Sequence, residues 1–168
     1  MESEFITREF SNSLEKNLLE QIFILNQENT PEVGNLGSID NLKNLLKMSY
    51  KNFYVMDAGQ IIAFVVCFKE GSLYKSKNYE FFCKQEESFV YIDRIAIKKN
   101  YRRKKLGNNL YKIIQGLASE EKSPLCCEVN TFPINRPSID FHHDFGFIEI
   151  GRQRFEENSV AYFKKELL

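Results

Sequence analysis

The sequence lacks tryptophan and carries no excess charge, because 23 Lys and Arg residues balance 23 Asp and Glu residues. A neutral chain does not indicate a polyanion-binding protein, so nucleic-acid binding would require a local basic patch. No apolar run approaches the roughly 20 residues that cross a membrane. The N-terminal stretch MESEFITREF has no basic and then apolar order of the kind found in signal peptides. These absences predict a cytoplasmic protein without a membrane partner.

Sequence motifs for metals and nucleotides are also missing. The four cysteines have no C-x-x-C spacing, and Cys67, Cys126 and Cys127 lie in apolar runs. This pattern predicts reduced thiols in the core and no metal site. Neither G-x-G-x-x-G nor the G-x-x-x-x-G-K pattern of a P-loop occurs, which argues against those two nucleotide-binding folds.

The hydrophobic pattern predicts one mixed α/β domain spanning residues 1–168. Ser13 is a candidate N-cap for the first helix, Gly146 is placed to end the last one, and residues 71–87 resemble a long irregular connection. Only one β-α-β unit requires parallel strands. We expect strands at 4–10, 52–57, 61–70, 88–99, 125–132, 147–155 and 159–167, and helices at 13–25, 39–49, 106–117 and 136–145.

A cluster of cations lies where the strongest strand ends and a helix begins. From Lys98 to Lys105, six of eight residues are basic. A helix N-terminus presents unpaired N–H groups and about half a positive charge, so added cations suit a phosphate or pyrophosphate. Gly107 lets a ligand approach the first turn closely, and Asn108 and Asn109 add donors. A solvated basic loop is the alternative explanation of the same charges.

The stretch IDRIAIKKNYRRKKLGNNLY resembles the central motif of the GNAT superfamily of N-acetyltransferases. In that family, a strand leads into an Arg/Gln-x-x-Gly-x-Gly/Ala loop and a helix that hold the pyrophosphate of CoA. Lys105 departs from the pattern, because it stands where the family usually has its first glycine. The matching residues are Arg102, Arg103, Lys104, Lys105, Leu106 and Gly107.

A second motif follows in the expected order and spacing. Residues 128–147, EVNTFPINRPSIDFHHDFGF, are similar to the family's next strand and helix, commonly Asn-x-x-Ala/Ser-x-x-Phe-Tyr-x-x-x-Gly-Phe. The resemblance covers nearly the whole chain and extends to a small bacterial branch of uncharacterised predicted GNAT acetyltransferases. The matching residues of the second motif are Asn135, Ser138, Phe141, His142, Gly146 and Phe147.

The resemblance implies a GNAT-like α/β (α+β) fold: a mixed, mostly antiparallel sheet with a central parallel β-α-β unit, splayed strands and flanking helices. Acetyl-CoA would lie as the acetyl donor in the V between strands 88–99 and 125–132. Its pantetheine arm would pair with the main chain of Ile95, Ala96 and Ile97 as an added strand does. Further expected contacts to acetyl-CoA, beside the basic loop and Gly107, are Leu106, Asn108, Asn135 and Ser138.

Direct transfer of an acetyl group to a primary amine needs a neutral amine and a proton for the leaving thiolate. His142 stands where the family often has a donor tyrosine, and imidazole titrates near neutrality. Packing beside acetyl-CoA is the alternative role of His142. Asp93 and Glu128 are candidate bases, because a carboxylate within an apolar strand is costly unless it is paired or functional.

Both carboxylates also have structural explanations. Asp93 can form an ion pair with Arg94, and Glu128 can hydrogen-bond across the splay. Many family members deprotonate the amine through ordered water instead. Strict alternation along the strand places Tyr91, Asp93 and Ile95 on one face and Arg94 and Ala96 on the other.

The acceptor remains open to any small-molecule or peptide amine, and a homodimer is possible. Asn26 and Asn29 lie in the loop that often edges the acceptor site in this family, and ordinary turn chemistry is their alternative role. A catalytically idle acyl-CoA-binding sensor or partner domain is the alternative function. Nucleic-acid binding through residues 98–105 is a third hypothesis, against which the neutral charge argues. Candidate pocket tyrosines are Tyr50, Tyr74, Tyr79 and Tyr91.

Overall fold

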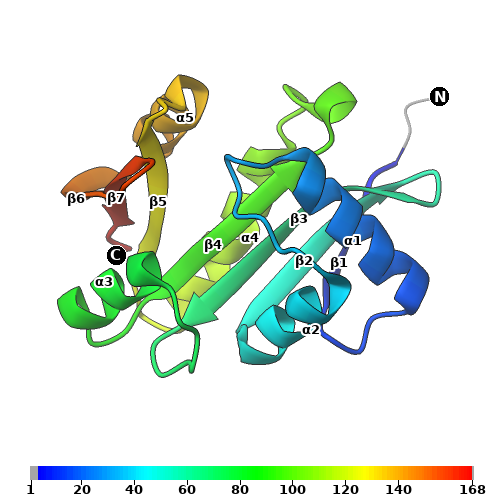
Figure 1. The fold of residues 1–168 in the computed structure, drawn as a ribbon, viewed down its shortest axis with the longest axis horizontal. Coiled ribbons are helices and arrows are strands. Elements are labelled where there is room, and N and C mark those ends of the chain that lie inside the picture. The colour runs from blue at the N-terminus through cyan, green and yellow to red at the C-terminus, as the bar shows by residue number, and fades with distance from the viewer. Residues whose placement is uncertain (1–3, 168) are drawn as a thin grey trace.

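The strands of the protein form one seven-stranded sheet in the order β1-β2-β3-β4-β5-β7-β6, seen in a computed structural model that describes residues 4–167 (Figure 1). Within these residues, no helix combines the length and apolar character required to cross a bilayer. The elements are β1 (Ile6–Phe10), α1 (Lys16–Glu28), α2 (Ile39–Met48), β2 (Lys51–Asp57), β3 (Gln60–Lys69), α3 (Lys77–Gln85), β4 (Val90–Ile97), a 3-10 helix (Lys99–Tyr101), α4 (Leu106–Glu120), β5 (Leu125–Phe132), α5 (Arg136–Phe145), β6 (Ile148–Arg154) and β7 (Ser159–Lys165).

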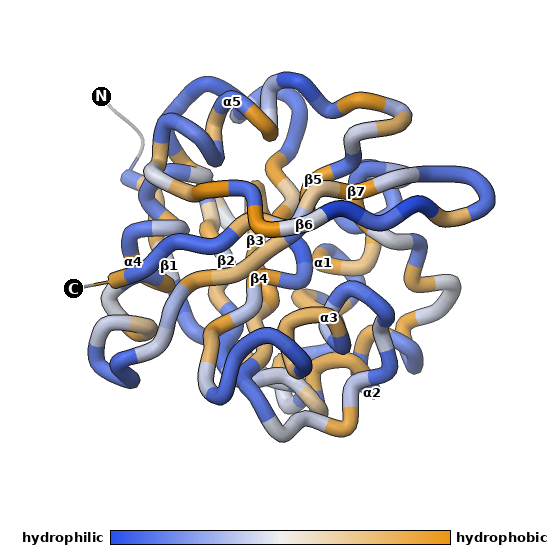
Figure 2. Tube along the Cα trace, turned by 90° about the vertical axis from the view of Figure 1, so that its left-hand side faces the viewer, coloured by the Kyte–Doolittle hydropathy of each residue, from blue (hydrophilic) through white to orange (hydrophobic). Residues whose placement is uncertain are grey.

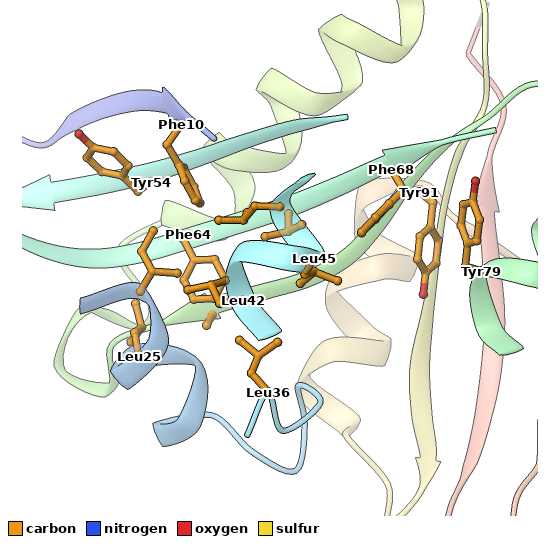
Figure 3. Packing of buried hydrophobic residues seen from close by; sticks show 14 of the residues in the cluster. Phe10, Leu25, Leu36, Leu42, Leu45, Tyr54, Phe64, Phe68, Tyr79 and Tyr91 are labelled. Carbon is orange, nitrogen blue, oxygen red and sulfur yellow. The ribbon is translucent and has the colours of Figure 1, made fainter. Parts of the chain in front are cut away.

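Helices cover both faces of the sheet, and each face has its own hydrophobic core. Strand β3 contributes to both cores, because Phe64 and Phe68 point to one face while Val65 and Cys67 point to the other. The first core joins the sheet to α1, α2 and α3 (Figure 3), and the second joins it to α4 and α5. Hydrophobic residues accordingly concentrate on the central strands, while the outer loops are mainly hydrophilic (Figure 2).

The predicted fold class is confirmed. All strand pairs are antiparallel except β4 with β5, and α4 is the crossover between these two parallel strands. The parallel register covers only Val90 with Leu125 and Tyr91 with Cys126. Beyond these two pairs the strands diverge, which gives the expected V (Figure 1). The three cysteines predicted to lie in the core are free and buried.

The start of the first helix differs from its prediction. Helix α1 begins at Lys16, and its N-cap Glu15 makes no side-chain capping bond. Ser13 does not cap it, because the Ser13 hydroxyl is hydrogen-bonded to that of Ser11 at 2.8 Å. The helix also runs further than expected and includes Asn26, which is fully buried.

The prediction of an irregular connection at residues 71–87 was wrong, because this segment contains α3. The Ser76 hydroxyl accepts a hydrogen bond from the Tyr79 amide and caps the helix. Tyr79 and Phe82 are three residues apart, lie on one helix face and are buried against the sheet. Helix α3 thus covers the first residues of β4, at the closed end of the V.

We expect Phe82→Ala to destabilise the protein by about 3–5 kcal/mol, because a fully buried aromatic ring leaves a cavity when removed. Denaturant unfolding measures this loss. Leu73→Ala in the same segment is the control, since Leu73 is 83% exposed and its truncation should change stability by less than about 0.5 kcal/mol. Equal effects of the two changes would contradict the packing of α3.

Candidate functional site

A cavity of about 330 Å³ opens between β4 and β5 beyond their last paired residues. Both layers of helices contribute to its wall, so the cavity passes between the two strands. The charged groups on the α1–α3 side include Asp93, Arg94 and Glu128. The polar groups on the α4–α5 side include Tyr111 and His142. Further lining residues are Pro31, Glu32, Val33, Gly34, Tyr74, Ser76, Asn78, Asn130, Asn135, Ser138 and Asn158.

A β-bulge in β4 decides which side chains reach this cavity. In the register with β3, Cys67 pairs with Ile92 and Val66 pairs with Arg94, which leaves Asp93 as an extra residue. A bulge bends the strand and redirects the side chains that follow it. Strict alternation was therefore wrong for Ile95, which packs with the α4 core, on the face opposite to Tyr91.

Asp93 is held in an ion pair. Its side chain is 5% exposed, and its carboxylate accepts from Arg94 Nε at 2.8 Å and from the Tyr74 hydroxyl at 2.7 Å. Arg94 in turn donates to Asn26 Oδ1 at 2.9 Å and to the Gly34 carbonyl at 3.0 Å. These contacts favour the structural explanation of Asp93.

Glu128 lies on β5 opposite the bulge, and its surroundings differ from those of Asp93. Its carboxylate accepts from the Tyr91 hydroxyl at 2.6 Å and from Asn78 Nδ2 at 3.3 Å. Among residues 4–167, no Lys or Arg forms an ion pair with it. Burial, followed by the negative charge of Asp93, raises the pKa of Glu128 to about 8, although the two hydrogen bonds lower it. Glu128 can therefore exchange a proton near neutral pH.

His142 is buried, and both of its ring nitrogens are engaged. Nδ1 lies 2.6 Å from the Ser138 carbonyl, which only accepts, so we assign the ring proton to Nδ1. Nε2 then accepts from the Tyr111 hydroxyl at 2.8 Å. Burial lowers the pKa of His142 to about 4, so the ring is neutral at pH 7. These bonds favour a positioning role for His142 over the predicted role as proton donor.

The basic segment forms the loop between β4 and α4. Arg103 and Lys105 have φ angles of 64° and 61°, in the left-handed region. Lys105 thus adopts the conformation that glycine favours, although it replaces the family's glycine. Helix α4 starts at Leu106 without a side-chain cap, so its first amides remain available to an anion. Gly107 packs against the end of β4, where an added Cβ would lie 3.5 Å from Ile97 Cδ1.

Other residues that are predicted to contact acetyl-CoA lie in the basic loop and at the start of α5. Arg102 donates to Asn29 Oδ1 at 3.0 Å, and Lys104 lies over the Tyr101 ring at 5.3 Å. Asn135 Oδ1 accepts from the Ser138 amide and caps α5. The splayed edge of β4 and the uncapped start of α4 fit a ligand that has a peptide-like arm and phosphates.

Asn78 and Tyr111 belong to the site but were not predicted. Asn78 lies in α3, which was expected to be irregular, so no face could be assigned to it. Tyr111 lies in a helix whose apolar spacing was counted without it, and the proximity of Tyr111 to His142 appears only in three dimensions. Of the candidate tyrosines, Tyr74 lines the cavity and Tyr91 contacts Glu128, while Tyr50 lies away from it, bonded to Glu121.

Solved structures share this fold. The ribosomal-protein-S18-alanine N-acetyltransferase from Escherichia coli superposes with a TM-score of 0.68 at 16% identity, covering 97% of this chain and 96% of the other. Ard1 from Thermoplasma volcanium gives a TM-score of 0.72 at 19% identity, with 98% and 99% covered. Arabidopsis thaliana NAA60 in complex with acetyl-CoA gives 0.72 at 14% identity, with 96% and 97% covered.

No curated protein matches the chain in sequence. The family model described as Acetyltransferase (GNAT) family matches residues 19–147, which include β4, the basic loop, α4, β5 and α5. The chain therefore belongs to the GNAT acetyltransferase family, whose activity is acetyl-CoA-dependent acetyl transfer.

Proposed function

We propose that the protein transfers an acetyl group directly from acetyl-CoA to a primary amine, with Glu128 as the base. The supporting observation is the raised pKa of a carboxyl group that lies in the cavity of the V and forms no ion pair with any residue that the structure describes. An amine enters such a site as an ammonium ion, which supplies the missing positive charge. The carboxylate can then take a proton from it, because its pKa of about 8 is close to that of many amines.

Acetyl-CoA supplies the activated acetyl group: the amine nitrogen bonds to the carbonyl carbon, the C–S bond breaks, and the CoA thiolate leaves with the second proton that the nitrogen loses. The unpaired edge of β4 at Ile95, Ala96 and Ile97 is suited to pair with its peptide-like arm. The α4 N-terminus and the exposed cations Arg103 and Lys105 are suited to its pyrophosphate. A backbone N–H of β4 would polarise the thioester carbonyl.

The remaining polar groups keep Glu128 in place and tune its pKa. The Tyr91 hydroxyl and the Asn78 amide both donate to its carboxylate, which fixes the orientation of the oxygen atoms. Asp93 is ion-paired with Arg94, and its charge disfavours a second negative charge on Glu128 in the same cavity. His142 orients the Tyr111 hydroxyl at the opposite wall.

Acetyl transfer is tested directly by measuring acetyl-CoA binding by calorimetry and free-CoA release over a panel of small amines and peptide N-termini. Release that depends on one amine class supports the proposal. Binding without release from any acceptor favours the idle sensor domain. Polynucleotide binding at physiological salt, with no competition by CoA, would support the nucleic-acid hypothesis instead.

The Glu128→Gln change should lower kcat/KM by about a hundredfold, because it removes the general base. In the wild type, kcat/KM should rise with pH up to about 8, where Glu128 ionises. In the variant this rise should move to the pKa of the amine itself. Glu121→Gln is the isosteric control on the surface, and it should keep the wild-type pH profile.

The same change has a stability effect that does not depend on activity. The pKa of Glu128 rises from its usual 4.5 to about 8 on folding, so the folded state keeps a proton that the unfolded state releases. Stability therefore falls as pH rises through this window. Chemical unfolding between pH 5 and 9 should show a smaller fall for Glu128→Gln than for the wild type, and identical curves would contradict the raised pKa.

Charge reversal of the loop, Arg103→Glu with Lys105→Glu, should weaken acetyl-CoA binding at low salt by about 1–3 kcal/mol for each lost charge-assisted bond. Calorimetry measures this loss. Lys43→Glu with Lys47→Glu on α2 is the matched control, because it changes the net charge equally at a distant helix. Unchanged affinity in the loop variant would remove the pyrophosphate assignment.

A further inference from the structure

We propose that Arg94 is a positioning residue for the amine acceptor, because it fixes the loop of residues 31–34 that forms one wall of the cavity. This inference rests on the proposed acetyl transfer. Its evidence is a network of hydrogen bonds that ties the loop to the bulged part of β4 through the buried side chains of Arg94 and Asn26.

The guanidinium of Arg94 connects three segments of the chain. Its side chain is 8% exposed and is ion-paired with Asp93, the extra residue of the bulge. Nη1 donates to Asn26 Oδ1 at the end of α1 and to the Gly34 carbonyl in the loop. The arginine therefore joins α1, the loop and β4 at one point.

Asn26 also holds the loop. It is fully buried, and its Nδ2 donates to the Gly34 carbonyl at 3.0 Å and to Gln27 Oε1 at 3.0 Å. Gln27 Oε1 also accepts from the Leu36 amide at 3.1 Å. The Gly34 carbonyl thus receives two donors. The chain is also bonded to the end of α1 on both sides of Gly34, through the amides of Val33 and Leu36.

The loop is in turn part of the acceptor side of the cavity, which it lines from Pro31 to Gly34. Asp93, at the other end of the network, accepts from Tyr74, which also lines the cavity. A loop released from Arg94 would change the distance between these two walls. The site that receives the amine would be disturbed. The basic loop before α4 meets this region through the exposed hydrogen bond of Arg102 to Asn29, which lies outside residues 31–34, so we expect the donor end to change far less.

A lysine cannot reproduce these contacts. Arginine presents a rigid, planar set of donors, and here they point to Asp93, Asn26 and Gly34 at once. A lysine ammonium at the end of a flexible chain keeps the charge but cannot hold all three acceptors in this geometry. Arg94→Lys therefore keeps the positive charge but removes the geometry that positions the loop.

Arg94→Lys should raise KM for the amine by about tenfold, the effect of one lost charge-assisted hydrogen bond. The Kd of acetyl-CoA should stay within about twofold of the wild type. Hydrogen exchange should be faster at the amides of Val33 and Leu36, which bond to Asn29 and Gln27 in the intact loop. Arg152→Lys, at an exposed ion pair on β6, is the matched control and should change none of these quantities.

Asn26→Asp is a second test that is independent of Arg94. It keeps an oxygen for Arg94 but loses the N–H that reaches Gly34, so loop exchange and amine KM should rise together. If Arg94→Lys does not fold, this variant decides the question. Unchanged exchange and amine KM in the folded variants would overturn the inference, and so would an equal loss of acetyl-CoA affinity. If the wild type acetylates no amine, the proposed function fails, and the exchange data alone decide whether Arg94 holds the loop.

Discussion

The parallel pairing of β4 with β5 stops after two residue pairs, and the site depends on this limit. Continued pairing would satisfy the backbone of both strands and leave no room between them. Where the pairing ends, one edge of β4 keeps its donors and acceptors, and a cavity forms that side chains from both faces line. The bulge at Asp93 adds a second effect at the same place, since it turns Asp93 and Arg94 toward the α1–α3 side.

Two carboxylates in this cavity have different environments. Asp93 has a guanidinium and a tyrosine hydroxyl, so its charge is balanced. Within residues 4–167, the side chains that donate to Glu128 are the neutral Tyr91 and Asn78, and burial together with the charge of Asp93 raises its pKa to about 8. Such a pair combines a carboxylate held in an ion pair with one whose pKa lies near neutrality, a common arrangement in acid–base sites. The charge of Asp93 therefore also helps to raise the pKa of Glu128, the carboxyl group that we propose as the base.

The apolar strand runs predicted a mixed α/β domain with one β-α-β unit, and the family resemblance carried by the two spaced motifs implied the V. It did not predict the bulge, since one extra residue leaves the composition of β4 unchanged and shows only in the register with β3. Helix α3 was missed because its polar residues conceal the spacing of Tyr79 and Phe82. The roles of Arg94 and His142 depend on partners far away in the chain, Asn26 and Tyr111, so no local pattern could reveal them.

The loop before α4 shows a conflict between local conformation and charge. Arg103 and Lys105 both adopt positive φ angles, which cost a non-glycine residue about 1–2 kcal/mol each. Glycine at position 105 would relieve this strain, but it would remove a cation from the start of a helix that has no side-chain cap. Strain of this kind is found where a site requires a specific side chain in an unfavourable conformation. Lys105 thus adopts an unfavourable backbone conformation but adds positive charge where the α4 dipole already favours an anion. The departure from the family pattern is therefore consistent with the pyrophosphate site proposed for the loop.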